Sequence, residues 1–437
     1  RKDGPKSRLR EQDIHKIVDT FNNFLEIQGY SRMITFAEIS DQKNDFNLNL
    51  QRYIDSSVSE DIQSIDGHLR GGIPELDVDA LNSFWKAFPD LRKSLFETTG
   101  RTGFVKLKIP IEEVETKIFS HQEFETFKKK VVSVLNEWKE FCIPHLQNFD
   151  KGSATKQLIL VLSNDLLNRF SKSHLIEAYD LYQHLMDYWS ETMQDDCYLV
   201  SSSGWEDGVV PREVIKVKNV NGKLVWPKVD FDYLKGKRRF KSDLIAKKII
   251  IDQYFVTEQE KITSLQSELS KNELDIQGMI DENSGEEGLL EDVIEGEHDN
   301  QKITIKAIKV QLKKNKDDPN FIDENKALMD CLKLLDKEAE IKNKIKSATK
   351  DLNTKLESKY SKLKEKEIKS LVIENKWLSY LSNKIHEELS YVSQTLASRI
   401  KELANRYDTP LPKLQNDLET ISNKVREHLK EMGAKWE

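Results

Sequence analysis

The chain has 437 residues, which is enough for about two to four domains, and it carries a formal net charge of −7. One third of the residues are charged, 38% are hydrophobic, and glycine and proline are scarce. This composition favours long, solvated helices over a compact α/β enzyme. The acidic balance excludes nucleic-acid binding through the charge of the whole chain, so any DNA contact must come from local basic patches.

Cysteines and apolar runs exclude further classes. The three cysteines are far apart, which gives neither a disulfide framework nor the spacing of a zinc site. The cysteine spacing fits a reducing cytoplasm, which is the expected location. No apolar run reaches the roughly 18 residues of a membrane span, so no membrane partner is expected.

The N-terminal half predicts helices joined by loops. Residues 1–8 and 30–75 are expected to be mostly loop, and Phe104 to Ile109 resembles a short strand. Gly29 is expected to close the first helix, and Pro89 to kink the second. Apolar residues recur at helical spacing, and so predict helices, over residues 10–28, 77–97, 154–170 and 173–194.

The sequence pattern changes from helical to strand-like after Cys197. Residues 214–218 and 223–226 have the character of strands, and Asn221-Gly222 between them is a strong hairpin signal because both residues tolerate positive φ. We therefore expect a small β insertion over 197–245.

The remainder, 246–437, predicts an arm of long helices. It includes an acidic connector, 281–301, with nine Asp or Glu and no Lys or Arg, and a long helix over 323–363. Pro410 and Pro412 separate two strongly periodic segments, which we expect to fold back as an antiparallel helical hairpin over 376–436. Their stripes are Leu378, Leu381, Ile385, Leu389, Val392, Leu396, Ile400, Leu403 and Tyr407, then Leu414, Leu418, Ile421, Val425, Leu429, Met432 and Trp436.

The predicted fold class is therefore mainly α, with a small β-hairpin insertion and a long antiparallel helical or coiled-coil arm at the C-terminus. The expected domains are a segment over 1–100, a helical domain over 101–196, the β insertion over 197–245 and the arm over 246–437.

One short run carries a family resemblance. Residues 44–55, Asn-Asp-Phe-Asn-Leu-Asn-Leu-Gln-Arg-Tyr-Ile-Asp, favour a shaped loop because Asn and Asp side chains bond to nearby backbone. Together with Leu9 to Phe21 upstream, this run resembles the modification subunit of type I restriction-modification systems. It departs from the family at Gln51, where the family usually has proline. Further segments with the same resemblance are His68 to Pro74, residues 77–97, Lys376 to Arg399, Asp408 to Pro412 and Met432 to Trp436.

The resemblance implies an adenine-N6 DNA methyltransferase that uses S-adenosylmethionine. It implies a specificity subunit and a restriction subunit as partners, with helices near this end docking the specificity subunit and embracing DNA. The family's Gly-rich cofactor loop and Asn/Asp-Pro-Pro-aromatic motif are absent, since the chain has no Pro-Pro dipeptide. We therefore expect a methyltransferase core to precede Arg1. The chain itself is predicted to be inactive, with no catalytic, cofactor-binding or metal-binding residue.

Other chemistry is poorly supported. A phosphate loop is absent, which weighs against the ATP-driven restriction subunit. A nuclease pairing of Phe88-Pro89-Asp90 with Glu137-Trp138-Lys139 would place both pieces on helices instead of adjacent strands. His174 and His184 are expected in core or surface positions, not as metal ligands. Asp195-Asp196 is expected to end a helix in a solvated loop.

The strongest local charge feature comprises Lys235, Lys237, Arg238, Arg239 and Lys241, with Phe240 among them. This cluster is a candidate phosphate-binding site for nucleic acid. A solubilising loop, or an ion-pair partner for the acidic 281–301 stretch, remains an alternative. Lys302 to Lys316 is a weaker second candidate. For the whole chain, the alternative functions are a helical coiled-coil scaffold without an enzymatic role and an independent nucleic-acid-binding module.

Overall fold

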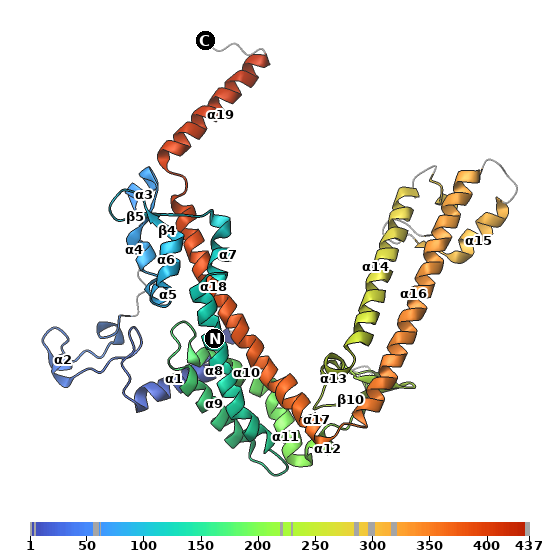
Figure 1. Ribbon diagram of the computed structural model, residues 1–437, viewed down its shortest axis with the longest axis horizontal. Coiled ribbons are helices and arrows are strands. Elements are labelled where there is room, and N and C mark those ends of the chain that lie inside the picture. The colour runs from blue at the N-terminus through green and yellow to red at the C-terminus, as the bar shows by residue number, and fades with distance from the viewer. Residues whose placement is uncertain are drawn as a thin grey trace. The chain divides into compact units, whose positions relative to one another are not determined.

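The computed structural model is mainly α-helical with small antiparallel sheets, which confirms the predicted fold class (Figure 1). It falls into two compact units: the first is Arg1–Ser201 with Trp377–Glu437, and the second is Ser202–Lys376. The structure describes residues 2–3, 6–55, 61, 63–218, 222–228, 230–283, 288–295, 302–315 and 321–432. None of the helices in these ranges combines the length and the apolar character that a membrane crossing requires.

The first unit begins with a pair of two-residue strands, β1 (Lys2–Asp3) and β2 (Lys6–Ser7), where a loop was expected. Helix α1 (Glu11–Asn22) starts after Arg10, whose backbone N–H donates to the Asp13 carboxylate. It ends before Gly29 because the chain turns at Phe24, which has φ +50°. Two short helices follow, α2 (Phe36–Ser40) and α3 (Ile65–Arg70).

The predicted helix over 77–97 is three helices, α4 (Glu75–Asp79), α5 (Asn82–Ala87) and α6 (Pro89–Leu95). Pro89 does not kink a helix but begins α6, where its missing N–H costs no hydrogen bond. A three-stranded antiparallel sheet in the order β3-β5-β4 lies beside them. It confirms the predicted strand and comprises β3 (Ile73–Pro74), β4 (Phe96–Thr98) and β5 (Phe104–Leu107).

Long helices form the core of the first unit. Helix α18 (Ser379–Tyr407) packs against α7 and α10, and Figure 1 shows it running alongside them. Eleven α18 residues are buried, because its apolar stripe faces these neighbours. The other helices of this core are α7 (Val114–Phe119), α8 (Gln122–Gln147), α9 (Thr155–Phe170), α10 (Ala178–Tyr188) and α11 (Gln194–Ser203).

The expectation that Asp195-Asp196 ends a helix in a solvated loop is wrong. A π-helical turn, Trp189–Met193, carries the chain from α10 directly into α11, so both residues lie in the first turn of a helix. Asp195 is exposed, whereas Asp196 is buried and accepts a hydrogen bond of 2.8 Å from the indole Nε1 of Trp377. Adjacent helical residues point in different directions, so a carboxylate inside the core needs such a donor.

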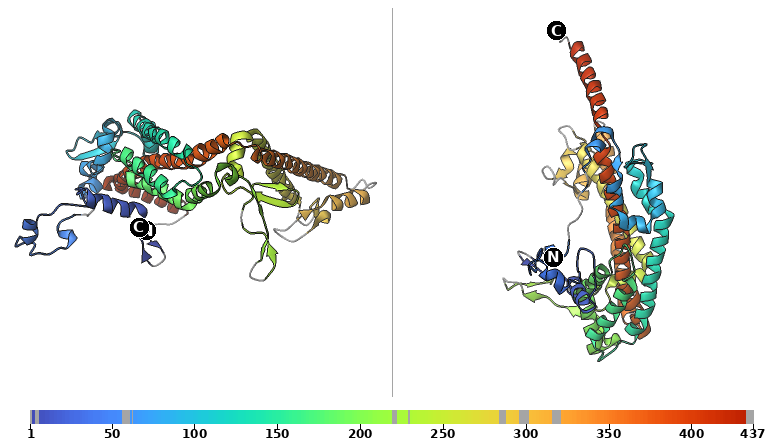
Figure 2. Two further views of the ribbon diagram at one scale, coloured as in Figure 1. Left: turned by 90° about the horizontal axis from the view of Figure 1, so that it is seen from below. Right: turned by 90° about the vertical axis from the view of Figure 1, so that its left-hand side faces the viewer.

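The second unit contains a long antiparallel helix pair, α14 (Val256–Asn283) and α16 (Ile322–Tyr360). Figures 1 and 2 show the two helices side by side. Asn272 donates to the backbone carbonyl of Leu334, and Lys355 and Lys342 pair with Glu258 and Glu273. The shorter helices of this unit are α12 (Trp205–Gly208), α13 (Lys247–Tyr254), α15 (Ile305–Lys314) and α17 (Glu365–Ser370), and a π-helix, Leu371–Leu378, follows α17.

The described part of the acidic connector, 281–283 and 288–295, is not simply a solvated linker. Leu290 and Val293 are buried in an apolar cluster with residues of α14, α15 and α16. Strands β11 (Ile294–Glu295) and β12 (Lys302–Ile303) pair beside this cluster. The other connector residues lie outside the described ranges.

Helix α19 (Leu411–Glu431) corrects the expected C-terminal hairpin. It has no buried residue, and its main contacts are with α3, whereas α18 packs on α7 and α10. The long antiparallel pair of this chain is therefore α14 with α16, and α18 belongs to the helical core of the first unit.

The β insertion is confirmed but starts later than Cys197, because α11 and α12 extend to Gly208. A three-stranded antiparallel sheet has the order β6-β10-β9, from β6 (Arg212–Val214), β9 (Tyr233–Lys235) and β10 (Arg238–Lys241). The predicted hairpin is formed by β7 (Val217–Lys218) and β8 (Leu224–Val225). Gly222 has φ +72°, as such a turn requires, while Asn221 lies outside the described residues.

Candidate functional site

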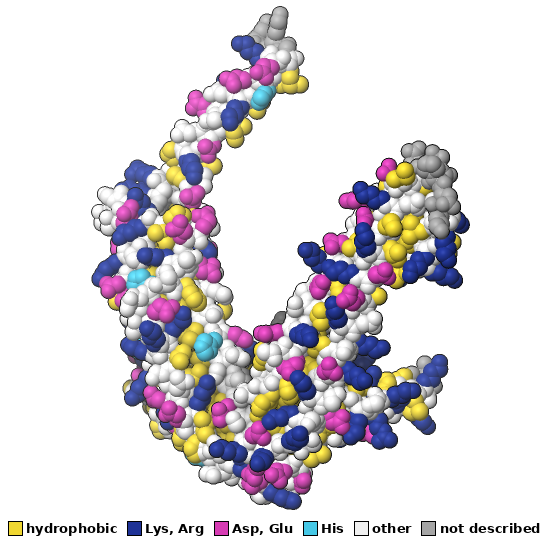
Figure 3. Space-filling view, turned by 45° about the vertical axis from the view of Figure 1, so that its right-hand side comes forward, with side chains coloured by type: hydrophobic (Ala, Val, Ile, Leu, Met, Phe, Trp, Pro, Cys, Tyr) yellow, Lys and Arg dark blue, Asp and Glu magenta, His cyan; other side chains and the backbone are white. Residues whose placement is uncertain are grey.

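The five cations predicted as a nucleic-acid site lie on one β-hairpin. Lys235 ends β9, Lys237 lies in the turn with Gly236, and Arg238, Arg239 and Lys241 belong to β10. Figure 3 shows several Lys and Arg side chains gathered around a projecting lobe on the right of the view. The structure therefore brings all five together on one hairpin.

Two of the five cations are engaged by carboxylates. Lys235 pairs with Glu357 of α16 at 2.7 Å, and this hydrogen bond raises the pKa of Lys235. Arg238 pairs with Glu213 of β6 at 3.6 Å. These partners differ from the acidic 281–301 stretch that was one alternative, so the described contacts give no support to that pairing.

Arg239 is held by aromatic rings. Its guanidinium carbon lies 4.3 Å from the centroid of Trp226 and 4.9 Å from that of Phe231. Cation–π contacts of this kind orient the guanidinium without neutralising its charge. The sequence signal of five cations did not reveal these two aromatic partners, because both lie outside the cluster.

A buried carboxylate fixes the sheet. Asp232 accepts hydrogen bonds from the backbone N–H groups of Ser242, at 2.6 Å, and Lys247, at 2.7 Å. Burial raises the pKa of its carboxyl, and the two amide donors oppose that rise. Tyr360 of α16 donates to the carbonyl of Ile245, which ties the insertion to the long helix pair. The cations are thus presented on a rigid support.

The weaker candidate, Lys302 to Lys316, comprises β12 and α15, with Lys316 outside the described residues. Its mixed periodicity arises because a strand changes to a helix at Thr304, whose side chain caps α15. The Gln311 amide donates to Asp292 and Glu324 inside the unit. Part of this segment is therefore structural core.

The N-terminal segment exposes apolar side chains. Helix α1 packs on α10 through polar contacts: Gln12 donates to Asp180, Tyr179 donates to Asp19, and His15 stacks on Tyr182. Its apolar residues Ile14, Ile17 and Phe21 consequently face outward. Further exposed apolar residues of this segment are Phe24, Leu25, Met33, Phe36, Phe46, Leu48 and Leu50.

The 44–55 run is the shaped loop that its composition predicted. The Asn47 and Asn49 side chains accept from the backbone N–H groups two residues on, and Tyr53 donates to the Asn47 carbonyl at 2.6 Å. Gln51 lies in a short 3₁₀ turn, Leu50–Arg52, and its N–H donates to Asn49. The proline that the family usually has at this position has no N–H and could not make that bond, so the turn of this chain has a hydrogen bond that such a proline would lack.

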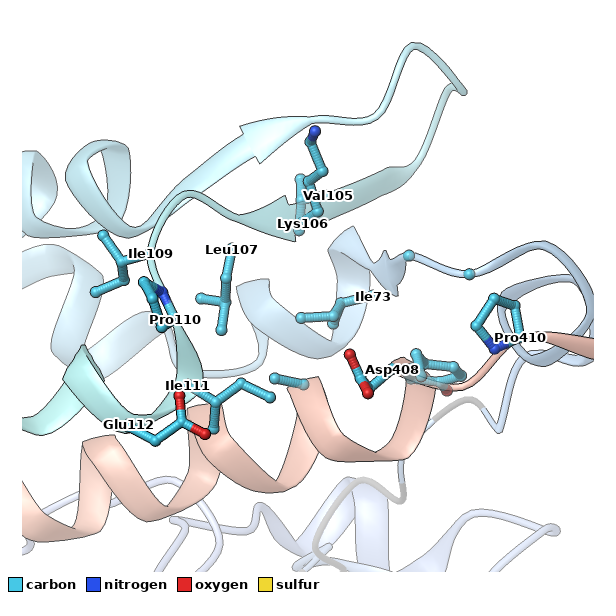
Figure 4. Close-up of a pocket in the computed structure, with 14 residues that line it drawn as sticks. Ile73, Val105, Lys106, Leu107, Ile109, Pro110, Ile111, Glu112, Asp408 and Pro410 are labelled. Atoms are coloured by element: carbon cyan, nitrogen blue, oxygen red, sulfur yellow. The ribbon is translucent and has the colours of Figure 1, made fainter. Parts of the chain in front are cut away.

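A hollow of about 550 Å³ lies in the first unit where α18 ends (Figure 4). Ile73, Val105 and Leu107 line it from the sheet, and Tyr407 and Pro410 from the end of α18. Tyr407 also contacts Gly67 so closely that an added Cβ would lie 2.8 Å from its ring. Nine of the fourteen lining residues are apolar, and Lys106, Glu112 and Asp408 are among the others.

The residues considered for metal or nuclease chemistry lie apart from one another, and each makes a different contact. Asp90 pairs with Lys93, and Glu137 with Arg169. His184 contacts Glu388 at 2.8 Å, and His174 lines a second hollow of about 480 Å³. Across the described ranges, no group of three or more His, Cys, Asp or Glu side chains is arranged to hold a metal ion.

Comparison with known proteins covers the N-terminal part of the chain. Residues 1–61 match the N-6 DNA Methylase family. The Type I restriction enzyme MjaVII methylase subunit of Methanocaldococcus jannaschii is 46% identical over 48 residues, which are 11% of this chain and 8% of that relative. No solved structure matches. The resemblance seen in the sequence is confirmed over this part of the chain, which is similar to N-6 DNA methylases and to a type I methylase subunit.

Proposed function

We propose that this chain is the non-catalytic C-terminal region of an adenine-N6 DNA methyltransferase subunit of a type I restriction-modification system. Its role would be assembly, with the catalytic domain on one side and the specificity subunit on the other. The parent subunit would use S-adenosylmethionine, and DNA and the restriction subunit would be further partners. One observation carries the proposal: the segment related to N-6 DNA methylases turns its apolar side chains to solvent.

This exposure is concentrated and large. Phe36, Leu48 and Leu50 are 73%, 71% and 72% exposed. Burying one such side chain stabilises a complex by roughly 1.5–3 kcal/mol, so several exposed apolar side chains in one segment favour an interaction surface. We assign an N-6 DNA methylase domain as its occupant, because the exposed residues lie inside the 1–61 match. Helix α1 adds to this surface, because its packing on α10 leaves its apolar face available for a partner.

Helix α19 offers the second surface. Its apolar residues Leu411, Leu414, Leu418, Ile421 and Val425 follow one another at intervals of three and four, and all are exposed. A seam with this near-heptad spacing is suited to another helix. We propose a helical part of the specificity subunit as the partner of this seam.

We assign the catalytic steps to the proposed catalytic domain and not to this chain. The sequence holds neither the Gly-rich cofactor loop nor the Asn/Asp-Pro-Pro-aromatic motif that would grip a flipped adenine. This chain would therefore position the other parts of the complex and bind its partners. None of its groups would touch the reacting atoms.

The test combines this chain with the N-6 DNA methylase domain of a type I subunit and measures co-sedimentation without DNA. We expect a stable complex with the wild type and its loss in the double variant Leu48→Asp, Leu50→Asp. The matched control is Leu274→Asp, Met329→Asp, which adds the same two charges at exposed apolar positions of the second unit.

A second readout is transfer of labelled methyl groups from S-adenosylmethionine to DNA. We expect no transfer by this chain alone. Transfer by the chain alone, or failure of the wild type to form the complex, would overturn the proposal. In the latter case the alternative, a helical scaffold without an enzymatic role, would be favoured by the α14–α16 pair and its apolar end cluster.

A further inference from the structure

We propose that the β insertion of the second unit binds the phosphate backbone of duplex DNA without sequence preference. The surface consists of the sheet β6-β10-β9 and the adjoining hairpin β7–β8, and we call it the basic sheet. This inference goes beyond the assembly role and does not rest on the family relationship, because the matched residues 1–61 lie in the other unit.

The basic sheet lies in a strongly positive stretch of the chain. Residues 212–248 contain twelve Lys or Arg and four Asp or Glu, a net charge of +8 in a chain whose total is −7. Such a reversal within 37 residues creates a positive potential that attracts polyanions. A solubilising loop needs no such concentration of one sign.

Some of these cations are neutralised by carboxylates, and others are not. The carboxylates of Asp243 and Glu213 pair with Arg212 and Arg238, and the buried Asp232 accepts from backbone amides. Three cations, Lys237, Arg239 and Lys241, form no ion pair with any residue in the described ranges. Arg239 and Lys241 alternate along β10, so they share one face of the strand, and Lys237 immediately precedes it.

The aromatic residues of the basic sheet favour duplex over single-stranded nucleic acid. Single strands are held largely by bases that stack on open aromatic rings. Here the rings are occupied: Arg239 and Lys216 lie over Trp226, and Arg239 and Lys247 lie over Phe231. The aromatic residues therefore orient cations instead of offering stacking platforms. This arrangement fits a partner that presents phosphates.

The shape of the insertion is consistent with a duplex. The β7–β8 hairpin is a two-stranded ribbon with exposed Val217 and Leu224 beside its lysines. A two-stranded ribbon is narrow enough for the major groove of B-DNA. The neighbouring sheet, fixed by Asp232 and Tyr360, can then hold its cations against the flanking phosphates. Rigid presentation reduces the ordering that binding would otherwise cost.

The test measures binding of the whole chain to a mixed-sequence duplex of about 30 base pairs by fluorescence anisotropy, over roughly 50 to 200 mM salt. The variant is Lys237→Gln, Arg239→Gln, Lys241→Gln. The control is Lys86→Gln, Lys130→Gln, Lys172→Gln, which removes three charges at exposed lysines around the second hollow, the one that His174 also lines. Circular dichroism checks that both variants keep the wild-type melting temperature.

We expect the slope of log K against log salt to become shallower by about 2.7 in the basic-sheet variant, and affinity to fall about tenfold or more at the lower salt. The control should retain most of the wild-type binding, and a single strand of equal length should bind more weakly than the duplex. An unchanged slope in the basic-sheet variant, an equal loss in the control, or equal displacement by polyglutamate would overturn the proposal. None of these results depends on the methylase domain, so this inference and the proposed function fail separately.

Discussion

Helices α18 and α19 follow one another in the chain and carry the same kind of apolar stripe, yet they end in opposite environments. Helix α18 buries its stripe against α7 and α10, whereas α19 buries none of its residues. Ile400 is fully buried, and Leu418 is 67% exposed. The comparison teaches that a helical stripe fixes the conformation of a segment but leaves open which surface covers it.

The largest expected effect comes from the buried helix. Ile400→Ala would remove a fully enclosed side chain from the core of the first unit. We expect a loss of about 2–5 kcal/mol in the free energy of unfolding, because the cavity adds to the lost transfer energy. Urea unfolding followed by circular dichroism measures the change. A loss below about 1 kcal/mol would show that α18 is not packed as described.

A second prediction concerns the ion pairs that hold the end of α18. Arg399 and Arg406 both bind Asp61, whose side chain is largely buried. Burial opposes ionisation, but hydrogen bonds from the two arginines outweigh it and lower the pKa of Asp61. We expect Asp61→Asn to reduce stability by about 2 kcal/mol at neutral pH.

The pH dependence of this effect has a definite sign. A lowered pKa means that the folded state favours the ionised carboxylate, so its stabilisation is present above the unfolded value of about 3.9. It is lost as the pH falls through the folded-state pKa. The stability difference between wild type and Asp61→Asn should therefore shrink below about pH 4. A difference that stays constant down to about pH 2 would contradict the assigned role of Asp61.

A smaller effect is expected where α18 begins. Trp377→Phe would remove the donor from the 2.8 Å hydrogen bond to the buried Asp196 and keep the aromatic ring. We expect a loss of about 1–2 kcal/mol, measured by thermal unfolding. Tyr380→Phe is a suitable control, since it removes a hydroxyl from a partly exposed ring that stacks on Tyr188. Equal effects of the two variants would show that the hydrogen bond from Trp377 to Asp196 does not stabilise the fold.

The smallest effect on stability is expected in α19. Leu418→Ala should change the free energy of unfolding of this chain by less than about 0.5 kcal/mol, because its side chain is already in solvent. Binding to the specificity subunit should instead weaken by roughly tenfold, measured by calorimetry, if the seam is the docking surface. A large loss of stability would show that α19 is covered within the chain itself.

Sequence reasoning succeeded where local chemistry decides. The Asn-rich loop of 44–55, the hairpin at Gly222 and the long helix α16 all follow from side-chain and backbone preferences. It failed where contacts with residues distant in the chain decide which side chains are buried. The burial of Asp196 depends on Trp377, and the open end of α19 depends on the absence of packing along α18.

The candidate surfaces divide in the same way. The five clustered cations were visible in the sequence because they are neighbours in the chain. Their division into ion-paired and unpaired groups was not, since Glu357 lies on α16 and Trp226 precedes the cluster. The exposed face of α1 could not be predicted either, because only its polar contacts with α10 reveal which side faces outward.

The central claim is that the 36–50 segment and α19 are docking surfaces that this chain leaves open. Amide hydrogen exchange of this chain, alone and assembled with an N-6 DNA methylase domain and a specificity subunit, tests it most directly. The account predicts fast exchange in both segments of the isolated chain, strong protection of both after assembly, and unchanged protection of α18. Slow exchange of α19 in the isolated chain, or no new protection in either segment after assembly, would contradict it.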